Sequence, residues 1–479
     1  MNYLEKQVVV IGAGPGGYAA AFYAASHGKD VLLIDKNSSL GGVCLNEGCI
    51  PSKALIHATE LIKEANHAES FGISFGKPKI DLDKLRNWKN SIISKLNGGI
   101  KMLADKKNVT VLNGRAIFED EKTIRVETES GQQFVKFEDC IIAVGSKPAL
   151  PAAFDLGNKR IMTSKEALDI EEIPETMLVV GGGYIGLELG SVYSALGSKI
   201  TVIEAFSNML AGADPDLVRP VSKLAKERFK EILTDTKVSK MATKGKKIAV
   251  SYENSNGKKE ELFDRVLVSV GRVPNSDDLG LSNAGIEVDD KKFIKVNDKL
   301  ETNIKNIYAI GDIAGGILLA HKASMEAKKA VESICGDNVS TNGVHIPAVV
   351  FTDPEVAWCG LTETEAKEKG QKVNVSKFSW SASGRALSLD RTDGLTKLIL
   401  EPETDKVLGV GIVGPGASEL IAEGCLAVEM EATAEDLSLV VHPHPTLSET
   451  LLESAEVFYG HSAHAFNPSK EGKANPVKV

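Results

Sequence analysis

The sequence predicts an α/β fold that contains one strand–turn–helix–strand unit twice. Residues 7–35 and 176–204 each read as an apolar strand, a glycine-rich turn, a helix with small residues on one side, a second strand and a terminal acid. Matching positions in the two units are separated by 169 residues throughout. Because this unit holds a dinucleotide pyrophosphate, its repetition predicts two Rossmann-like dinucleotide-binding domains.

The glycine spacing explains why each unit suits a dinucleotide. The first glycine permits the sharp turn, the second lets the backbone approach a pyrophosphate, and the third lets helix and strand pack closely. The pyrophosphate then lies at the N-terminus of the helix. One such turn is weak evidence, but two in one register favour nucleotide binding over a purely structural origin. The glycines are Gly12, Gly14 and Gly17 in the first unit and Gly181, Gly183 and Gly186 in the second.

An acidic residue ends each unit and is expected to accept hydrogen bonds from a ribose. Asp35 occupies this position in the first unit, followed by Lys36, and Glu204 occupies it in the second. The carboxylate of Glu204 opposes a 2′-phosphate, and the next residues, 205–207, include no arginine. The second site therefore predicts NAD rather than NADP.

A pair of cysteines follows the first unit. Cys44 and Cys49 are flanked by glycines, which suggests a disulfide that opens and closes. A regular helix places such residues about 7.5 Å apart along its axis, whereas a disulfide needs Cα atoms roughly 4.4 to 6.8 Å apart. A turn or distorted helix is therefore expected. Pro51 suits the first position of a helix, so Cys49 is expected just outside a helix N-terminus, with Lys53 adding positive charge. The alternative is two buried reduced cysteines.

Composition and charge exclude several classes of protein. A chain of 479 residues is too long for one core. The charge balance is 56 against 65, a net −9 without a basic cluster, so nucleic acid is an unexpected partner. No apolar run is long enough for a membrane span, and no signal peptide precedes the first strand, so a cytoplasmic protein is expected. The remaining cysteines are scattered and expected to be reduced: Cys140, Cys335, Cys359 and Cys425.

Two dinucleotide sites beside a cysteine pair predict an electron path. The first site adjoins the cysteine segment and is expected to hold the cofactor that touches the disulfide. A flavin exchanges electrons with both a dithiol and a nicotinamide, which predicts FAD at the first site and NAD at the second. A later segment, 305–312, reads as a strand that ends in Gly311 and Asp312. An acid there suits the ribitol hydroxyls of FAD; the alternative is a turn with a helix-capping aspartate.

These motifs resemble the pyridine nucleotide–disulfide oxidoreductases, and within that family the branch that oxidises dihydrolipoyl groups. The resemblance runs from about residue 5 to residue 466. It implies an FAD domain at 1–148, an NAD domain at 149–273, a return to the FAD domain at 274–345, and an α+β dimerisation domain at 346–479 that ends in a polar tail. The matching segments are 41–53, 143–148, 181–190, 271–275, 308–312, 319–323 and 442–449.

The resemblance also implies roles for single residues. Cys44 becomes the interchange thiol that reacts with substrate sulfur, and Cys49 the thiol next to the flavin. Lys53 resembles a lysine near the flavin, and Glu188 the acid paired with it; the alternative for both is a surface or interface ion pair. No metal is expected. The further cofactor positions are Gly145, Asp312, Ala320 and His321 for FAD and Gly271 for NAD.

His444 and Glu449 are the expected acid–base pair. Dihydrolipoyl thiols are weak acids and need a general base, and histidine titrates near neutral pH. Pro445 and Thr446 are expected to open a helix, which places both side chains on one side. A lone histidine is more often structural, and His442 lies in the same motif, but the resemblance assigns the role to His444. It further implies a homodimer in which His444 and Glu449 reach the cysteines of the other subunit.

The resemblance implies oxidation of dihydrolipoyl groups, with electrons passing through the disulfide and FAD to NAD+. The implied partners are lipoyl domains and the subunit-binding domain of a 2-oxoacid dehydrogenase acyltransferase, the carrier protein of glycine cleavage, or both. The alternatives are an NADPH-dependent reductase of glutathione, trypanothione or mercuric ion, and a non-catalytic flavoprotein. Glu204 disfavours the reductases. Two residues depart from the commonest pattern: Glu47, between the cysteines, and Tyr184, in the second turn.

Overall fold

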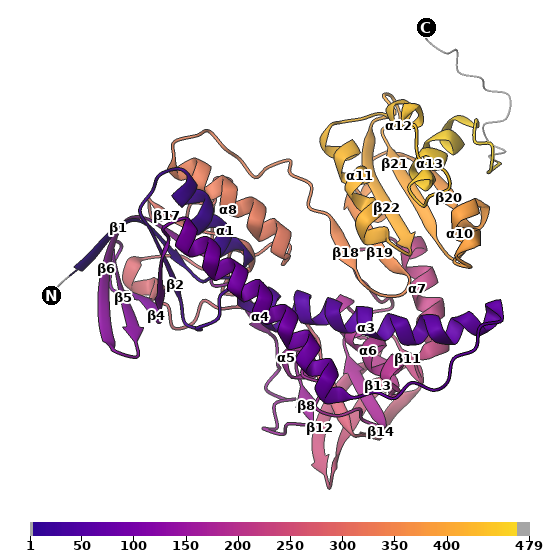
Figure 1. The fold of residues 1–479 in the computed structure, drawn as a ribbon, viewed down its shortest axis with the longest axis horizontal. Coiled ribbons are helices and arrows are strands. Elements are labelled where there is room, and N and C mark those ends of the chain that lie inside the picture. Colours follow the sequence, from indigo (N-terminus) through magenta and orange to yellow (C-terminus); the bar gives the residue numbers. More distant parts are fainter. Residues whose placement is uncertain (1–2, 467–479) are drawn as a thin grey trace. The chain divides into compact units, whose positions relative to one another are not determined.

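The computed structural model describes residues 3–466, which divide into two compact units (Figure 1). Unit 1 comprises residues 1–173 and 267–343, and unit 2 comprises 174–266 and 344–479. Each unit contains one copy of the repeated motif. The finer domain boundaries expected from the sequence remain predictions, and the polar tail lies outside the described residues.

Unit 1 is built on a seven-stranded sheet of order β3-β2-β1-β6-β5-β4, with β17 beside β6. The strands β1, β2, β3, β6 and β17 pair in parallel, whereas β4 and β5 are antiparallel additions. Val8–Ile11 and Val31–Ile34 are buried throughout, as expected for parallel strands covered on both faces. The strands of this sheet are β1 (Tyr3–Ile11), β2 (Val31–Asp35), β3 (Thr110–Asn113), β4 (Arg115–Phe118), β5 (Thr123–Thr128), β6 (Gly131–Ile142) and β17 (Ile307–Ala309); unit 1 also contains β7 (Ser146–Pro148), β8 (Ile161–Met162) and β16 (Arg272–Pro274).

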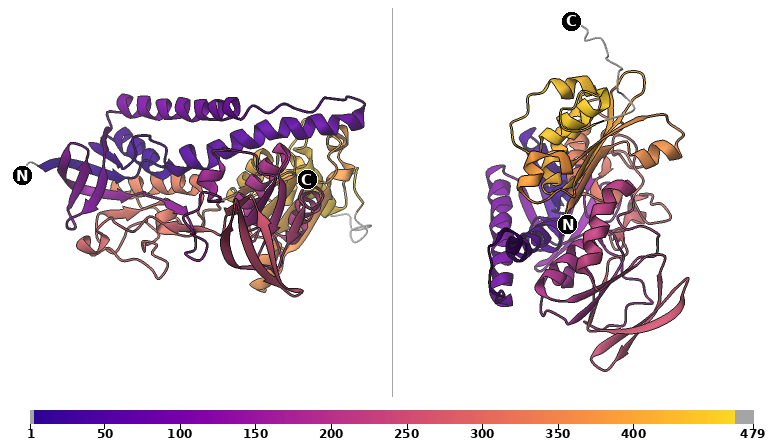
Figure 2. Two further views of the ribbon diagram at one scale, coloured as in Figure 1. Left: turned by 90° about the horizontal axis from the view of Figure 1, so that it is seen from below. Right: turned by 90° about the vertical axis from the view of Figure 1, so that its right-hand side faces the viewer.

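The helices of unit 1 place the cysteine segment beside the first glycine turn. Two long helices, α3 and α4, contact each other and are joined by an extended segment (Figure 2), and α1 packs against α8. A Cβ on Gly16 of α1 would lie 3.2 Å from the Cβ of Ala323, so small residues permit this helix contact. The helices are α1 (Pro15–Ser26), α2 (Gly42–Glu47), α3 (Cys49–His67), α4 (Leu82–Lys106), α5 (Ser164–Ala167) and α8 (Ala320–Ile334), with 3-10 turns η1 (Ala68–Phe71), η2 (Leu281–Ala284) and η3 (Gly311–Ala314).

Unit 2 begins with the second copy of the motif. Its strands β9, β10 and β11 are parallel, in the register set by Met177 opposite Ile200 and Val202 opposite Ile232. The antiparallel strands β12, β13 and β14 form a separate three-stranded sheet. The elements are β9 (Thr176–Val180), α6 (Tyr184–Leu196), β10 (Lys199–Ile203), α7 (Pro215–Arg228), β11 (Glu231–Leu233), β12 (Lys237–Lys244), β13 (Lys247–Asn254), β14 (Gly257–Phe263) and β15 (Arg265–Val268).

The C-terminal part of unit 2 is an antiparallel five-stranded sheet of order β18-β19-β22-β21-β20 with helices packed on it. This confirms the expected α+β layer after the two nucleotide motifs. Within residues 3–466, no helix has the length and apolar character needed to cross a membrane. The elements are β18 (Ala348–Val350), β19 (Glu355–Gly360), α9 (Glu363–Glu368), β20 (Asn374–Ser379), η4 (Trp380–Ala382), α10 (Gly384–Ser388), β21 (Leu395–Leu400), β22 (Val407–Gly414), α11 (Ala417–Glu429), α12 (Ala434–Leu439) and α13 (Glu449–Tyr459).

Candidate redox and dinucleotide sites

The acid at the end of β2 is held by the backbone of the first glycine turn. One oxygen of Asp35 accepts the N–H of Ala13 at 2.6 Å, and the other accepts the N–H of Asn37 at 2.8 Å. The carboxylate is buried. These bonds keep Asp35 at the mouth of the turn, and each carboxylate oxygen still has a lone pair for a ribose hydroxyl.

The second glycine turn repeats these hydrogen bonds 169 residues later. Glu204 accepts the N–H of Gly182 at 2.6 Å and the N–H of Phe206 at 2.8 Å. The longer glutamate side chain therefore reaches the same two backbone donors as the aspartate of the first unit. The two units agree in atomic detail as well as in sequence spacing.

Glycine is required in the two turns for two different reasons. At some positions the protein leaves no space for a side chain, and at others a ligand needs to approach the backbone. A Cβ on Gly17 would lie 1.7 Å from the carbonyl oxygen of Gly12, so the protein excludes one. By contrast, Gly14 and Gly183 have φ of −70° and −75°, which any residue adopts. A Cβ on Gly183 would meet no atom within 4 Å, and one on Gly14 would only touch the Cα of Gly42 at 3.9 Å. Glycine at these helix N-termini therefore fits close approach by a pyrophosphate, and the turns suit FAD and NAD.

Two distant sequence motifs of unit 1 meet as a two-stranded ribbon. Strand β7 pairs antiparallel with β16, with Ser146 opposite Pro274. Arg272 donates to the Ser146 hydroxyl at 2.7 Å and lies 3.6 Å from the carboxylate of Asp312. The Ser146 hydroxyl in turn donates to Asp312. The predicted ribitol-binding acid is thus oriented by two residues that sequence reasoning missed, although both lie in motifs that it identified.

The turn that carries Asp312 is anchored from α8. Glu326 is buried, accepts the N–H of Gly311 at 2.6 Å and forms an ion pair with Lys322 at 2.6 Å. Lys322 also donates to the carbonyl of Gly315 at 3.1 Å. Asp312 therefore lies in a short 3-10 turn that begins at Gly311, and both the N–H of Gly311 and the carbonyl of Gly315 are bonded to side chains of α8.

The other predicted cofactor residues all lie at element ends. Gly145 and Gly271 flank the β7–β16 ribbon and have φ of +68° and +126°, where glycine is favoured. His321 is exposed in the first turn of α8, next to the first helical residue, Ala320. Lys36 is exposed directly after β2. Their contacts with a cofactor remain predictions.

The cysteine segment is a helix interrupted by a glycine, in agreement with the expected distorted helix. Cys44 lies in α2, Gly48 breaks the helix with φ −147° and ψ −112°, and Cys49 begins α3. The prediction that Pro51 opens the helix was wrong, because α3 begins two residues earlier. Cys49 therefore lies in the first turn of α3, where the positive end of the helix dipole favours a thiolate.

The two thiols of this segment interact with each other. A hydrogen bond with Cys49 is the main cause that raises the pKa of Cys44; burial adds to it, and the charge of Lys53 opposes it only in part. Cys44 therefore keeps its proton in the reduced pair. Cys44 is half-buried and Cys49 is exposed in the chain by itself.

Glu47, whose role the sequence leaves open, forms an ion pair with Lys165 at 2.6 Å. This hydrogen bond raises the pKa of Lys165. Lys165 belongs to α5, whose capping box is formed by Thr163 and Glu166. The carboxylate of Glu47 is therefore directed to a cation on another element.

Helix α4 holds both partners of this contact in unit 1. Asn97 donates to the side chain of Asn46 at 2.8 Å, next to Glu47 in α2. Near the other end of α4, buried Lys89 donates to the carbonyl of Leu168 at 2.7 Å, just after α5. Burial lowers the pKa of Lys89, and the charge of Asp169 opposes that effect. The redox helix and α5 are thus attached to one scaffold.

Lys53 and Glu188 lie in different units. Lys53 is half-buried in α3. Glu188 is buried in α6 and accepts the N–H of Phe351 at 3.0 Å. The expected pairing of Lys53 with Glu188 remains a prediction.

His444 and Glu449 form the expected pair. Nδ1 of His444 lies 2.8 Å from Glu449, whose other oxygen accepts the N–H of Thr446 at 2.7 Å. The expected helix start at Pro445 was wrong, because α13 begins at Glu449 itself. Burial opposes ionisation of Glu449, but the hydrogen bonds from Thr446 and His444 outweigh it and lower its pKa. The contact with Glu449 involves Nδ1, so Nε2 is the ring nitrogen that this carboxylate does not hold.

Two further histidines differ from His444 in their surroundings. The ring of His442 is almost fully buried; Nε2 lies 2.7 Å from Glu423 and Nδ1 lies 3.0 Å from the carbonyl of Val440. Both ring nitrogens of His442 therefore contact protein oxygen atoms. His464 contacts Glu453 at 2.5 Å, and this hydrogen bond raises its pKa. The charge of His464 also helps to lower the pKa of Glu449. The sequence did not indicate that His464 lies near Glu449.

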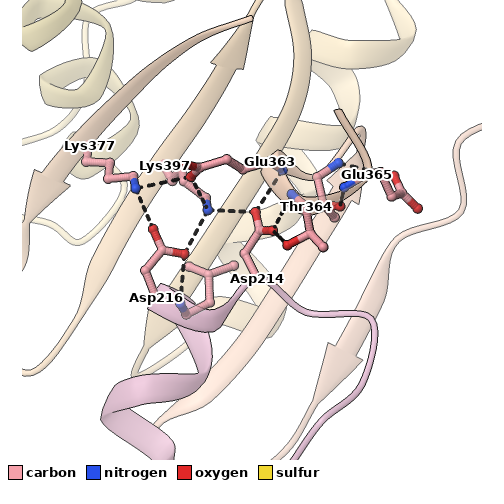
Figure 3. Close-up of polar contacts among 9 residues, drawn as sticks. Asp214, Asp216, Glu363, Thr364, Glu365, Lys377 and Lys397 are labelled. Atoms are coloured by element: carbon pink, nitrogen blue, oxygen red, sulfur yellow. Dashed lines mark hydrogen bonds and ion pairs between the residues drawn. The ribbon is translucent and has the colours of Figure 1, made fainter. Parts of the chain in front are cut away.

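A buried lysine joins the start of α7, the helix after the second nucleotide motif, to the C-terminal sheet of unit 2 (Figure 3). Lys397 of β21 is 1% exposed, and its ammonium lies 2.6 Å from Asp214, 2.7 Å from Asp216 and 3.3 Å from Glu363. These three carboxylates are close enough together to hold a metal ion. The lysine contacts all three, so the protein supplies its own cation there.

The chain resembles known proteins over nearly its whole length. Residues 6–327 match the family described as pyridine nucleotide-disulphide oxidoreductase, and residues 346–455 match its dimerisation domain. A dihydrolipoyl dehydrogenase of Vibrio parahaemolyticus is 44% identical over 95% of this chain and 96% of its own length. One of Staphylococcus aureus is 43% identical over 96% of this chain and 98% of its own length.

Two solved structures resemble the described fold. LpdA from Mycobacterium tuberculosis has a TM-score of 0.87 at 27% identity and covers 94% of this chain and 99% of its own. The HOCl-induced flavoprotein disulfide reductase RclA from Escherichia coli, as a Cu(II) complex, has a TM-score of 0.85 at 26% identity, covering 95% of this chain and 100% of its own.

Proposed function

The chain belongs to the pyridine nucleotide-disulphide oxidoreductase family, and from this we propose that it is a dihydrolipoyl dehydrogenase. It oxidises dihydrolipoyl groups and reduces NAD+ to NADH. FAD, when bound, supplies the two-electron link between the cysteine pair and NAD+. The observation that carries the proposal is the coexistence of a cysteine pair, two glycine turns with matched acids, and a histidine–glutamate pair in one chain.

The cysteine pair is proposed to carry the exchange with substrate. His444 accepts a proton from one dihydrolipoyl thiol, and the resulting thiolate attacks the Cys44 sulfur of the Cys44–Cys49 disulfide. The S–S bond breaks and Cys49 leaves as a thiolate, which the first turn of α3 stabilises. The second substrate thiol then displaces Cys44, which takes up a proton, and oxidised lipoamide leaves. The raised pKa of Cys44 supports this final protonation.

The nucleotide preference is proposed from Glu204. Its carboxylate is held at the mouth of the second turn by two backbone N–H groups. A 2′-phosphate placed there meets a fixed negative charge, whereas ribose hydroxyls meet an acceptor. NAD is therefore favoured over NADP.

A homodimer is proposed from the dimerisation domain and from its exposed apolar residues. Monomeric proteins rarely expose large contiguous apolar patches. In unit 2 such side chains precede His444, lie on α11 or directly follow it. His444 itself is 73% exposed, which fits a residue that acts on the partner's cysteine pair. The exposed side chains are Leu426, Met430, Leu439, Val440 and Val441.

The proposed partners are proteins that carry or dock the lipoyl group. They are the lipoyl domains and subunit-binding domain of a 2-oxoacid dehydrogenase acyltransferase, the carrier protein of glycine cleavage, or both. A cytoplasmic location is proposed because the bacterial cytoplasm keeps thiols reduced, which suits the free cysteines of the chain.

One assay tests the activity. Purified holoenzyme is expected to reduce NAD+ with dihydrolipoamide, and to show little oxidation of NADPH by glutathione disulfide. Turnover in the second reaction alone would contradict the proposal. The variants Cys44→Ser and Cys49→Ser are expected to abolish turnover while retaining bound FAD, measured by its visible absorption.

The base is tested by His444→Gln, with His442→Gln as the matched control. Loss of a general base typically costs about 10²–10⁴-fold, so His444→Gln is expected to slow dihydrolipoamide oxidation by at least about 100-fold. His442→Gln is expected to act mainly on stability. A near-normal rate for His444→Gln would move the role to another residue.

A further inference from the structure

A second pair of cysteines lies in unit 2, in the C-terminal sheet and the helix above it. Cys359 of β19 and Cys425 of α11 are both free thiols, and a hydrogen bond joins them. Cys359 is 1% exposed, and Cys425 is half-buried. This dithiol belongs to neither glycine turn and has no part in the proposed exchange with substrate.

The packing of α11 on the sheet explains why the two sulfurs meet. Cys359 lies opposite Val410 in the register of β19 and β22. Directly above, a Cβ on Gly424 would lie 2.8 Å from a methyl group of Val410. The helix backbone thus approaches the sheet more closely at Gly424 than any side chain would allow. The next residue on the helix, Cys425, is brought to Cys359, the strand neighbour of Val410.

The two thiols have unequal acidity. The hydrogen bond from Cys359 lowers the pKa of Cys425, and this outweighs the opposing effects of burial and of the charge on Glu429. The same contact, together with burial, raises the pKa of Cys359. Glu429 lies one turn further along α11 and contacts His345 at 3.2 Å. Cys425 is therefore the more reactive thiol, and Cys359 is the protonated neighbour.

We propose that Cys359 and Cys425 are a second redox site, which hydroperoxides oxidise to a disulfide independently of Cys44 and Cys49. The Cys425 sulfur attacks the peroxide, the O–O bond breaks, and a sulfenic acid and one water form from hydrogen peroxide. The Cys359 sulfur then attacks the sulfenic sulfur, the S–O bond breaks, and a second water leaves. Two thiols lose two electrons and two protons, and the peroxide is reduced to two waters.

The disulfide cross-links α11 to the sheet beneath it. The same helix carries Glu423, which holds His442 at 2.7 Å, two residues before His444. Oxidation at Cys425 therefore fixes the helix that anchors the His442–His444 segment. Closure of the ring also protects Cys425, because a sulfenic acid that is not resolved by a thiol oxidises irreversibly.

The experiment uses the Cys44→Ser/Cys49→Ser holoenzyme, which removes the first cysteine pair. The protein is treated with hydrogen peroxide, its remaining thiols are alkylated under denaturing conditions, and its peptides are analysed by mass spectrometry. We expect a cross-linked peptide that joins Cys359 to Cys425 and is lighter by two hydrogen atoms than its parts. Cys335, an exposed thiol in unit 1, is the control and should be absent from this cross-link.

Two further variants in the same Cys44→Ser/Cys49→Ser background test the two thiols separately. Cys425→Ser is expected to abolish the cross-link and leave Cys359 alkylated. Cys359→Val, of similar volume, is expected to abolish the cross-link and let Cys425 proceed to sulfinic acid. Should Cys359 stay fully alkylated after oxidation of the Cys44→Ser/Cys49→Ser protein, while Cys425 becomes sulfinic acid or links to Cys335, the proposal would be overturned.

Discussion

The two glycine turns share their hydrogen bonds but differ in the chain that follows each acid. In the first unit the N–H of Gly41 donates to the carbonyl of Ala13 at 2.8 Å, and in the second the N–H of Leu210 donates to that of Gly182 at 3.1 Å. These positions also keep the 169-residue offset. The first chain then enters the redox helix α2, whereas the second leads to α7.

This difference changes the surroundings of the second glycine of each turn. A Cβ on Gly42, at the start of α2, would lie 2.6 Å from the Cα of Gly14. A Cβ on Gly14 would accordingly touch the Cα of Gly42 at 3.9 Å, whereas a Cβ on Gly183 would meet no atom within 4 Å. The first turn is therefore packed on one side against the redox helix, and the second is not. The two sites therefore differ in the segment that follows the acid, whereas the glycine motif is the same in both.

The largest effect is expected from Gly17→Ala in the first turn, and Gly183→Ala in the second turn is its comparison. Gly17→Ala places a Cβ against the Gly12 carbonyl and is expected to cost more than about 3 kcal/mol, beyond ordinary overpacking, with loss of FAD. Gly183→Ala is expected to leave FAD content and thermal stability unchanged while weakening NADH binding. Equal loss of stability in both variants would contradict the distinction between a glycine required by protein packing and one required by a ligand. FAD absorption, thermal unfolding and NADH titration provide the measurements.

The next effect concerns α7, the helix that follows the second acid. Lys397→Met leaves Asp214 and Asp216 without their buried cation and is expected to cost about 3–5 kcal/mol. Lys377→Met, a partly exposed contact of Asp216 at 2.8 Å, is the control and should cost about 0–1 kcal/mol. Denaturant unfolding compares the two, and equal values would contradict the role of burial.

The same cluster gives the sign of a pH effect. Burial opposes ionisation of Asp214, but hydrogen bonds from Lys397 and Thr364 outweigh it and lower its pKa. A carboxyl group whose pKa is lower in the folded state contributes stability above its unfolded pKa of about 3.9. That contribution is lost as the pH falls through the folded pKa. Wild-type protein should therefore lose more stability below about pH 4 than Lys397→Met does.

Smaller effects are expected from substitutions of Asp35 and Glu204, the acids that end the two repeated units. Asp35→Asn and Glu204→Gln each remove one charge from a pair of backbone hydrogen bonds, a loss of about 1.5–3 kcal/mol for bonds to charged groups. Asp35→Asn is expected to lower FAD retention and leave the NADH affinity of the remaining holoenzyme unchanged. Glu204→Gln is expected to weaken NADH binding and narrow the preference over NADPH, with FAD retained. A change of FAD content in Glu204→Gln would show that the sites are not separable.

The smallest effect tests the segment attached to the first unit. Glu47→Gln removes an ion pair between half-exposed side chains, worth about 0–1 kcal/mol. Lys165→Met should have a similar effect, and the double variant should add little to either. Thermal unfolding of the three variants measures the coupling. A loss above about 2 kcal/mol in one single variant would mean that the contact does more than tether α2 to α5.

The sequence predicted those features that depend on local spacing. The glycine turns, their acids and the broken helix at Gly48 follow from steric limits on a few consecutive residues. The predictions at Pro51 and Pro445 were wrong in opposite directions. Helix α3 begins two residues before Pro51, and α13 begins four residues after Pro445, so a proline near a helix start does not by itself fix the first helical residue.

Other contacts were beyond local reasoning because their partners are far apart in the chain. Arg272 donates a hydrogen bond to Ser146, which is 126 residues away in the chain. Lys397 donates one to Asp214, 183 residues away. Glu47 forms an ion pair with Lys165 on another element. No spacing rule relates such positions, since strand pairing and helix packing bring them together.

By itself, the sequence determined the α/β class, the two dinucleotide turns, the redox cysteines and the histidine–glutamate pair, because each depends on residues close together in the chain. Tertiary structure alone decided which groups orient them. It directs Glu47 to Lys165, and it places Cys425 above Cys359 because Gly424 lets α11 approach the sheet. The physical reason is that burial and ion pairing depend on separations in space, which the fold creates from residues remote in sequence.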